Sequence, residues 1–296
     1  MIFFLQQTLN GLVLGCVYAL FALGFSLVLS VLRIFNVAHE GVITWGALAA
    51  YGAIALLGLP WAVGMGMAAL FAGFANVLIY FTAIRHLRRR PNREMEGFIS
   101  SLGALIAIVE VADLALGGDV TRLPFGAFPF HTWFVGGVAI STIQLAFTGS
   151  TAVVFLALWW LLQRTQFGRE VRTVAFNRDI AASLGINVEW TIIRVFAISG
   201  ACAGIGATLV GTAFNVIDSG LGARYSLMAI AVTVIGGFGS LSGSVFGGLL
   251  VGLVSSLTTA YWTTSYRDVV VFSAMLVLLW IMPRGLFGTT LESGRA

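Results

Sequence analysis

Polar residues that could do chemistry are few and scattered in this sequence, and none forms a catalytic pattern. The pair His39-Glu40 would fit a zinc-protease helix only with a second histidine four residues after the first, and Ile43 stands there. Cys16 and Cys202 lie in apolar runs, without the spacing of a disulfide framework or a metal site. No paired aspartates and no serine–histidine arrangement suit an intramembrane enzyme. The sequence therefore predicts no metal site and no catalytic residue.

The basic residues exclude a further group of chemistries, because all 16 are arginine. Without lysine the chain cannot form a phosphate-binding Walker A loop, a Schiff base or a serine–lysine nucleophile pair. We therefore expect a protein that is not an enzyme, that binds no cofactor and that cannot hydrolyse ATP through a P-loop of its own.

The elements that hold these residues must lie in a membrane. Hydrophobic residues make up 59% of the 296 residues and charged residues only 9%, with a mean hydropathy of +0.98. Soluble domains carry about 25% charged residues, so this chain could not cover a water-exposed surface. The net charge of +4 comes from arginines at the ends of apolar runs, which indicates membrane topology and not nucleic-acid binding.

Apolar runs with few or no charges recur along the chain, and a helix needs about 20 predominantly apolar residues to cross a bilayer. The runs cover 12–32, 41–84 with a turn near 58–61, 97–116, 148–162, 190–214, 225–266 with a break at 236–243, and 269–282. The run 134–147 is short for a crossing and predicts a re-entrant or interfacial segment. We therefore predict an all-α, polytopic integral membrane protein of about eight or nine transmembrane helices, some broken or re-entrant, in one domain over 1–296.

Arginine placement predicts the orientation, because positive residues favour the cytoplasmic side. Five arginines lie within 85–93, and four more lie within 164–178. We expect the loops 85–96 and 164–190 and the C-terminus in the cytoplasm, and the side of the N-terminus stays open.

Polar residues interrupt the apolar helices at two places, 33–41 and 236–243. Such groups are costly at membrane depth and usually face a cavity or the interior of the bundle. Transporters often carry broken helices at corresponding positions of two repeats, so this pair would fit an inverted repeat, although no residue-level repeat is clear. The alternative is that both are short connections, a loop between two helices at 33–41 and a Gly/Ser turn at 236–243.

The segment 167–187 has the spacing of a short amphipathic helix followed by a second one. Asn177 or Asp179 would cap the second helix, and Gly185 would end it. Spacing alone leaves two interpretations open: a helix pair that lies on the membrane surface, or a surface that docks a soluble partner.

A set of short motifs runs in order along nearly the whole chain. The motifs are Asn10-Gly11-Leu12, Tyr18-Ala19-Leu20, the run from Leu32 to His39, Gly168-Arg169 through Ala175, Asn177-Arg178, Ala181-Ala182, Gly185-Ile186-Asn187, the run from Gly236 to Ser240, Tyr266-Arg267-Asp268 and Pro283-Arg284-Gly285-Leu286. In this combination the chain resembles the LivH-type permease subunits of ABC importers for branched-chain amino acids. One departure is His39-Glu40-Gly41, where the family usually has His-Gly followed by an acidic residue.

The resemblance implies an all-helical permease of the bacterial inner membrane. Its partners would be a second permease subunit, two ATPase subunits, a periplasmic or lipid-anchored substrate-binding protein and membrane lipid, but no nucleic acid. The loop 168–187 would couple to an ATPase subunit through Gly168, Arg169, Arg172, Ala175, Asn177, Arg178, Ala181, Ala182 and Gly185. We expect the translocation path to pass the polar breaks, at Asn36, His39, Glu40, Gly236, Gly237, Gly239 and Ser240.

The sequence leaves the substrate open. Branched-chain or related small amino acids are the first expectation, and urea, short amides or aromatic acids are alternatives for the same type of permease. A stand-alone channel or secondary transporter is a further alternative, but the spans hold few acidic residues or histidines for an ion site. Co-purification with an ATPase would favour the importer subunit.

Overall fold

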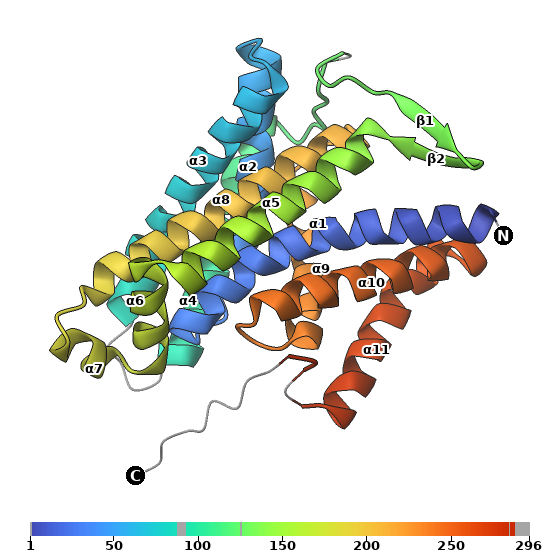
Figure 1. Cartoon of the computed structure of the whole chain (residues 1–296). Helices are drawn as coiled ribbons and strands as arrows, with labels where there is room; N and C mark the ends of the chain where they lie inside the picture. The colour runs from blue at the N-terminus through green and yellow to red at the C-terminus, as the bar shows by residue number, and fades with distance from the viewer. Residues whose placement is uncertain (1, 88–92, 125, 284, 288–296) are drawn as a thin grey trace.

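Helices make up most of the computed structural model, which describes residues 2–87, 93–124, 126–283 and 285–287 (Figure 1). Seven helices in these ranges are long and apolar enough to cross a membrane. They are α1 (Ile2–Leu32), α3 (Trp61–Ile79), which two further turns extend to Leu87, α4 (Arg93–Leu116), α5 (Thr142–Arg164), α8 (Val188–Phe214), α10 (Leu241–Tyr261) and α11 (Arg267–Ile281), which the 3-10 turn η4 (Thr264–Tyr266) precedes. Two shorter elements join them, α2 (His39–Tyr51) with the π-helical turn η1 (Gly52–Leu56), and α9 (Leu221–Gly236). The predicted polytopic, all-α membrane fold is confirmed.

α1 is the central helix of the bundle. It carries no charged residue, and the stretch 17–23 is at most 2% exposed. α10 packs along α1 through glycines on both helices: Gly11 and Gly15 face Gly248 and Gly252, and a Cβ added at any of them would lie within 3 Å of the other helix. Small residues let membrane helices approach this closely, so these glycines set the distance between α1 and α10.

The bundle contains two similar units that run in opposite directions, α1–α4 and α8–α11. The contacts correspond: α1 packs on α10 as α8 packs on α3, and α2 packs on α4 as α9 packs on α11. In both units six residues connect the long helix to the short one, and the first of them, Arg33 or Asn215, has a positive φ, 55° or 50°. α1 runs toward the end of the bundle that carries α6 and α7, whereas α8 runs away from it (Figure 1). The fold therefore has an inverted repeat.

The segments that correspond in the two units are not the pair that the sequence predicted. The break at 33–41 precedes the short helix of the first unit, so it corresponds to 215–220. The break at 236–243 follows the short helix of the second unit, so it corresponds to the α2–α3 turn at 57–60. The prediction paired two breaks by their polarity, but their positions relative to the short helices decide which of them correspond.

A β-hairpin stands where the sequence predicted a re-entrant or interfacial segment at 134–147. β1 (Thr132–Val135) and β2 (Val138–Ser141) pair antiparallel, and α5 begins directly after them. The re-entrant alternative was wrong because Gly136 and Gly137 adopt positive φ, 60° and 83°, which forms a tight hairpin turn. The side-chain amide of Gln6 donates to and accepts from the backbone of Ala139, at 3.0 and 2.8 Å, and so fixes the hairpin to the start of α1. We call this end of the bundle the hairpin end.

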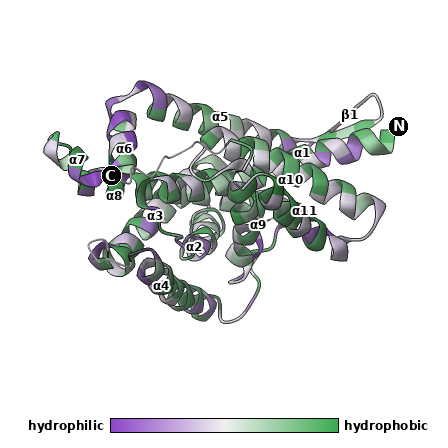
Figure 2. Cartoon of the chain, turned by 90° about the horizontal axis from the view of Figure 1, so that it is seen from below, coloured by the Kyte–Doolittle hydropathy of each residue, from purple (hydrophilic) through white to green (hydrophobic). Residues whose placement is uncertain are grey.

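The opposite end carries two short helices, α6 (Gln166–Phe176) and α7 (Arg178–Ser183). Figure 2 shows hydrophilic residues along both, whereas long stretches of the spans are hydrophobic. The same view shows α2 and α9 in the middle of the molecule, with α4 beside α2 and α11 beside α9. We call this the α6–α7 end.

Candidate functional site

The ends of α7 are set by residues that the sequence analysis considered. Asn177 accepts the backbone N–H groups of Asp179 and Ile180 at 2.8 and 3.1 Å. The helix ends before Gly185, whose φ of 79° is the left-handed conformation that closes a helix. Of the two caps considered, Asn177 is the one used, and the predicted helix end at Gly185 is confirmed.

Three predicted coupling residues attach α6 and α7 to the spans. Gly168 packs so closely on the backbone of Leu162 in α5 that a Cβ would overlap it. The guanidinium of Arg172 donates to the Leu162 carbonyl, and that of Arg178 donates to the last two carbonyls of α1, at 3.4 and 3.2 Å. A cation at a helix C-terminus also interacts favourably with the helix dipole. The helix pair is therefore fastened to both α1 and α5.

The apolar surface that α6–α7 presents outward differs from the predicted coupling set. Ala181 is fully buried against the bundle, whereas Phe176, Ile180 and Leu184 are 70%, 47% and 70% exposed. Phe176 ends α6, Ile180 lies in α7 and Leu184 directly follows α7, and three large apolar residues within this polar segment were the signal in the sequence. The other predicted residues divide by exposure: Arg169, Arg172, Asn177, Ala182 and Gly185 are exposed, Ala175 and Arg178 are half-buried, and Gly168 is buried.

Two predicted path residues are buried polar groups at the start of α2. Asn36 and His39 are 2% and 3% exposed, and none of their side-chain nitrogen and oxygen atoms is hydrogen-bonded to a described residue. The ring of His39 lies against Gly24 of α1 and 6.2 Å from the ring of Phe25. Buried polar groups without partners are costly, which is typical of sites with a function beyond packing.

Glu40 stands where two helices meet. It is half-buried in the first turn of α2, and its carboxylate accepts a hydrogen bond of 3.4 Å from the hydroxyl of Ser226 in α9. The Glu40 carbonyl faces Gly222 so closely that a Cβ at position 222 would overlap it. Thr44 accepts the N–H of Gly222 at 3.0 Å. The first turns of α2 and α9 therefore touch.

The remaining predicted path residues form the turn between α9 and α10. Gly236 is buried against Gly243, and Gly237, also buried, has a φ of 102°. Gly239 lies beside Ser30 near the end of α1, which places this turn at the α6–α7 end. Ser240 caps α10 by accepting the N–H of Gly243 at 3.0 Å. The structure thus separates these glycines from Glu40 by the length of α9.

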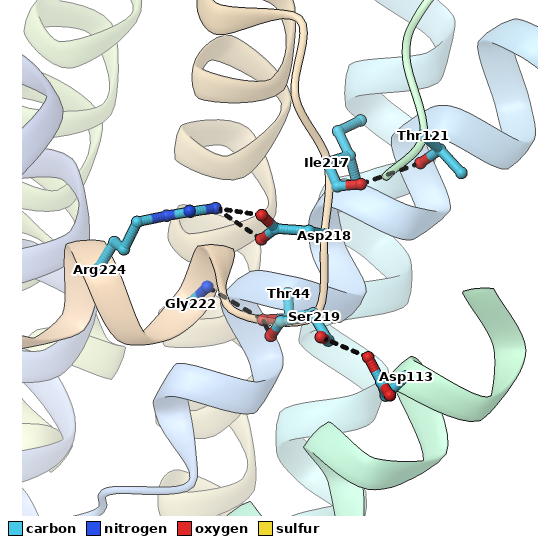
Figure 3. Close-up of polar contacts among 8 residues, drawn as sticks. All are labelled: Thr44, Asp113, Thr121, Ile217, Asp218, Ser219, Gly222 and Arg224. Carbon is cyan, nitrogen blue, oxygen red and sulfur yellow. Dashed lines mark hydrogen bonds and ion pairs between the residues drawn. The ribbon is translucent and has the colours of Figure 1, made fainter. Parts of the chain in front are cut away.

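The connection between α8 and α9 is held by residues that the sequence analysis did not assign to a site (Figure 3). Its hydrogen bonds run from Ser219 to Asp113, at 2.7 Å, and between the backbones of Thr121 and Ile217, at 2.9 and 3.0 Å. Arg224 pairs with Asp218 through contacts of 2.5 and 2.7 Å. The signal that was missed is the pair of opposite charges six residues apart in an otherwise apolar region.

Sequence comparison settles the family. Residues 7–280 match the family described as the branched-chain amino acid transport system permease component. The chain belongs to this family. This permease is 31% identical, over 299 residues, to the high-affinity branched-chain amino acid transport system permease protein LivH of Escherichia coli K12, covering 97% of this chain and 96% of the relative. It is 30% identical, over 294 residues, to the corresponding protein BraD of Pseudomonas aeruginosa, covering 96% of each chain.

Comparison of folds gives a more distant likeness. The solved structure of PsaBC from Streptococcus pneumoniae in complex with Fab matches 96% of this permease and 94% of that chain, with a TM-score of 0.51 and 16% identity. At this identity the likeness concerns the fold alone. Within the described part of the permease, no group of three or more His, Cys, Asp or Glu side chains could hold a metal ion.

Proposed function

We propose that this permease is the membrane-spanning subunit of a bacterial inner-membrane ABC importer for branched-chain or closely related amino acids. It acts as one domain over 1–296 with a second permease subunit, two ATPase subunits and a periplasmic or lipid-anchored binding protein. The observation that carries the proposal is the helix pair α6–α7, fastened to two spans and presenting large apolar side chains outward. The names of LivH and BraD, which specify branched-chain amino acids, support the substrate class.

The arginine distribution supports an orientation with α6–α7 in the cytoplasm. Only Arg122, Arg224 and Arg267 belong to the hairpin side of the predicted topology, and the other 13 arginines belong to the opposite side. Because α1 begins at the hairpin end, the N-terminus then faces the outside of the cell.

The exposed side chains of α6–α7 support docking to an ATPase subunit. Phe176, Ile180 and Leu184 would each leave water on binding, which stabilises a contact by about 25 cal/mol for each Å² of apolar surface buried. Since Arg172 and Arg178 join the pair to the ends of α5 and α1, a movement of the docked ATPase would reach two spans directly.

The α2–α9 side of the bundle, between α4 and α11, is our candidate translocation path. Backbone and polar groups at membrane depth are tolerated where they are buried or line a cavity. Asn36, His39 and Glu40 lie at the start of α2, and α9 leads from there toward the turn at the α6–α7 end. We assign to the path Asn36, His39, Glu40, Gly236, Gly237, Gly239 and Ser240.

The test is reconstitution with the ATPase subunits, the second permease and the binding protein in liposomes. Wild type is expected to take up leucine in an ATP-dependent manner. Phe176→Ser should reduce co-purification of the ATPase by about tenfold, since loss of a buried aromatic anchor costs more than about 1 kcal/mol. The matched control is Phe134→Ser in the hairpin, an equally exposed phenylalanine (77% against 70%) at the other end of the bundle.

Two results would contradict the proposal. If Phe134→Ser and Phe176→Ser lowered ATPase binding equally, α6–α7 would not be the docking surface. Uptake of urea, a short amide or an aromatic acid but not of leucine by the complete complex would assign a different substrate class, and uptake by the purified chain alone would indicate a channel or secondary transporter.

A further inference from the structure

The first turns of α2 and α9 meet near the middle of the membrane-spanning bundle. Gly41 lies against Ile108 of α4, about 16 Å along the helix from the start of the apolar stretch 97–116 and about 12 Å from its end. His39 lies against Gly24, about 12 Å before α1 ends. Both short helices therefore begin inside the bundle, and Glu40 lies at a depth where water and ions are scarce.

Among the described residues, Glu40 has no cationic partner at this depth. It forms no ion pair with any described residue, and the only side-chain partner it has there is the neutral hydroxyl of Ser226. The arginine nearest in sequence to that serine, Arg224, is paired with Asp218. A half-buried carboxylate at membrane depth is costly unless a cation pairs with it. A cationic group on a molecule that enters the bundle would supply the missing partner.

We propose that Glu40 pairs with the α-ammonium group of the amino-acid substrate as it passes the middle of the membrane. This inference rests on the proposed function. A carboxylate offers about four acceptor positions, and Ser226 occupies one, so the carboxylate can still accept an N–H of an ammonium group. Pairing with the Glu40 carboxylate would favour zwitterionic amino acids over urea, short amides and acids that lack an ammonium group.

Gly222 acts as a positioning residue for this site. Any side chain at position 222 would overlap the Glu40 carbonyl and press against the hydroxyl of Thr44. Glycine therefore allows α9 to approach α2 closely enough for Ser226 to reach the Glu40 carboxylate.

Charge rescue in the reconstituted complex tests the proposal. We expect leucine uptake by Glu40→Cys to be at least tenfold below wild type. Modification with the negatively charged sulfonatoethyl methanethiosulfonate should restore at least a third of wild-type uptake, whereas the trimethylammonium reagent and the neutral methyl reagent should not. The native Cys16 and Cys202 are only 7% and 3% exposed. Wild-type permease treated with the same three reagents controls for any reaction at these two cysteines.

The matched control is Glu110→Cys, because Glu110 is an exposed glutamate of the neighbouring helix α4. Its uptake should stay near wild type with all three reagents. Restoration of Glu40→Cys by the neutral reagent as well as by the negative one would show a packing role and overturn the inference. Near wild-type leucine uptake by Glu40→Gln would also overturn the inference. Labelling of the introduced cysteine in Glu40→Cys is measured by mass spectrometry, and a position 40 that the reagents cannot reach would contradict its place on the substrate path.

Failure of the proposed function gives a different pattern. If the wild-type complex took up no leucine at all, the importer assignment and this inference would fall together. If wild type and Glu40→Gln both took up leucine at similar rates, the role of Glu40 would be contradicted and the importer assignment would stand.

Discussion

Replacing Arg178 with alanine should uncouple ATP hydrolysis from uptake. The guanidinium of Arg178 donates to the last two carbonyls of α1, at 3.4 and 3.2 Å, and so joins α7 to the central helix of the bundle. Alanine keeps the helical propensity of α7 but removes this connection. The ATPase could then still dock on α7 while the movement no longer reaches α1.

The magnitude follows from the geometry. Hydrogen bonds to charged groups contribute about 1.5–3 kcal/mol, and a cation at a helix C-terminus adds about 0.3–1 kcal/mol. The two hydrogen bonds from Arg178 to α1 are long, so for this connection we take the lower limit, about 1.5 kcal/mol. This corresponds to about a tenfold loss in the population with α7 fastened to α1. The number of leucine molecules imported per ATP should fall by a similar factor.

The assay measures ATP hydrolysis and leucine uptake on the same proteoliposomes. Arg164→Ala is the matched control, because Arg164 is an exposed arginine at the end of α5, lies outside the predicted coupling set and forms no ion pair with any described residue. We expect Arg164→Ala to keep the wild-type ratio. An unchanged ratio in Arg178→Ala, at normal expression, would refute the reasoning and leave α7 as a surface helix.

Four further outcomes follow from the same structure. Gly185→Val forces a β-branched residue into a φ of 79° and costs about 1–2 kcal/mol of backbone strain, so stimulated ATPase activity should fall, whereas Gly185→Asn should retain most of it. Ala182→Trp enlarges the exposed surface of α7 and should abolish uptake while membrane insertion, followed by fractionation, stays normal. In intact cells Arg169→Cys should resist an impermeant maleimide and Asp119→Cys should react; the reverse pattern would invert the topology. Gly237→Leu, at a φ of 102°, should block uptake, and normal uptake at normal expression would remove that turn from the path.

Much of the fold could be predicted because the membrane makes apolar length decisive. The apolar runs predicted the approximate bounds of most spans, and the helices end close to the predicted turns at 58–61 and 236–243. The predicted number, eight or nine, exceeds the seven helices of spanning length in the described residues, because α2 and α9 are short. The hairpin was missed because Gly136 and Gly137 act through backbone conformation, which hydropathy does not register. The breaks 33–41 and 236–243 were paired wrongly for a similar reason. Which connections correspond depends on whether each one precedes or follows a short helix, and hydropathy does not show this.

The candidate site was predictable only in part. Asn177 and Gly185 have roles that follow from local backbone chemistry, and those roles appear as predicted. The contact between Glu40 and Ser226 joins residues 186 positions apart, so no local pattern could reveal it. For the same reason Arg178 could be placed near a docking surface, but its connection to the end of α1 could not be foreseen.

The opposed direction of the two four-helix units has a consequence for how the permease changes shape. Each unit is a similar arrangement of one long helix, one short helix and two further spans, seen from opposite sides of the membrane. If the two units exchanged conformations, an opening toward one side would become an opening toward the other, with corresponding helix contacts exchanged between the units. Two end states related in this way would share most of their kinds of helix–helix contact. A modest push at one end of α1 would then be enough to tip the balance between them.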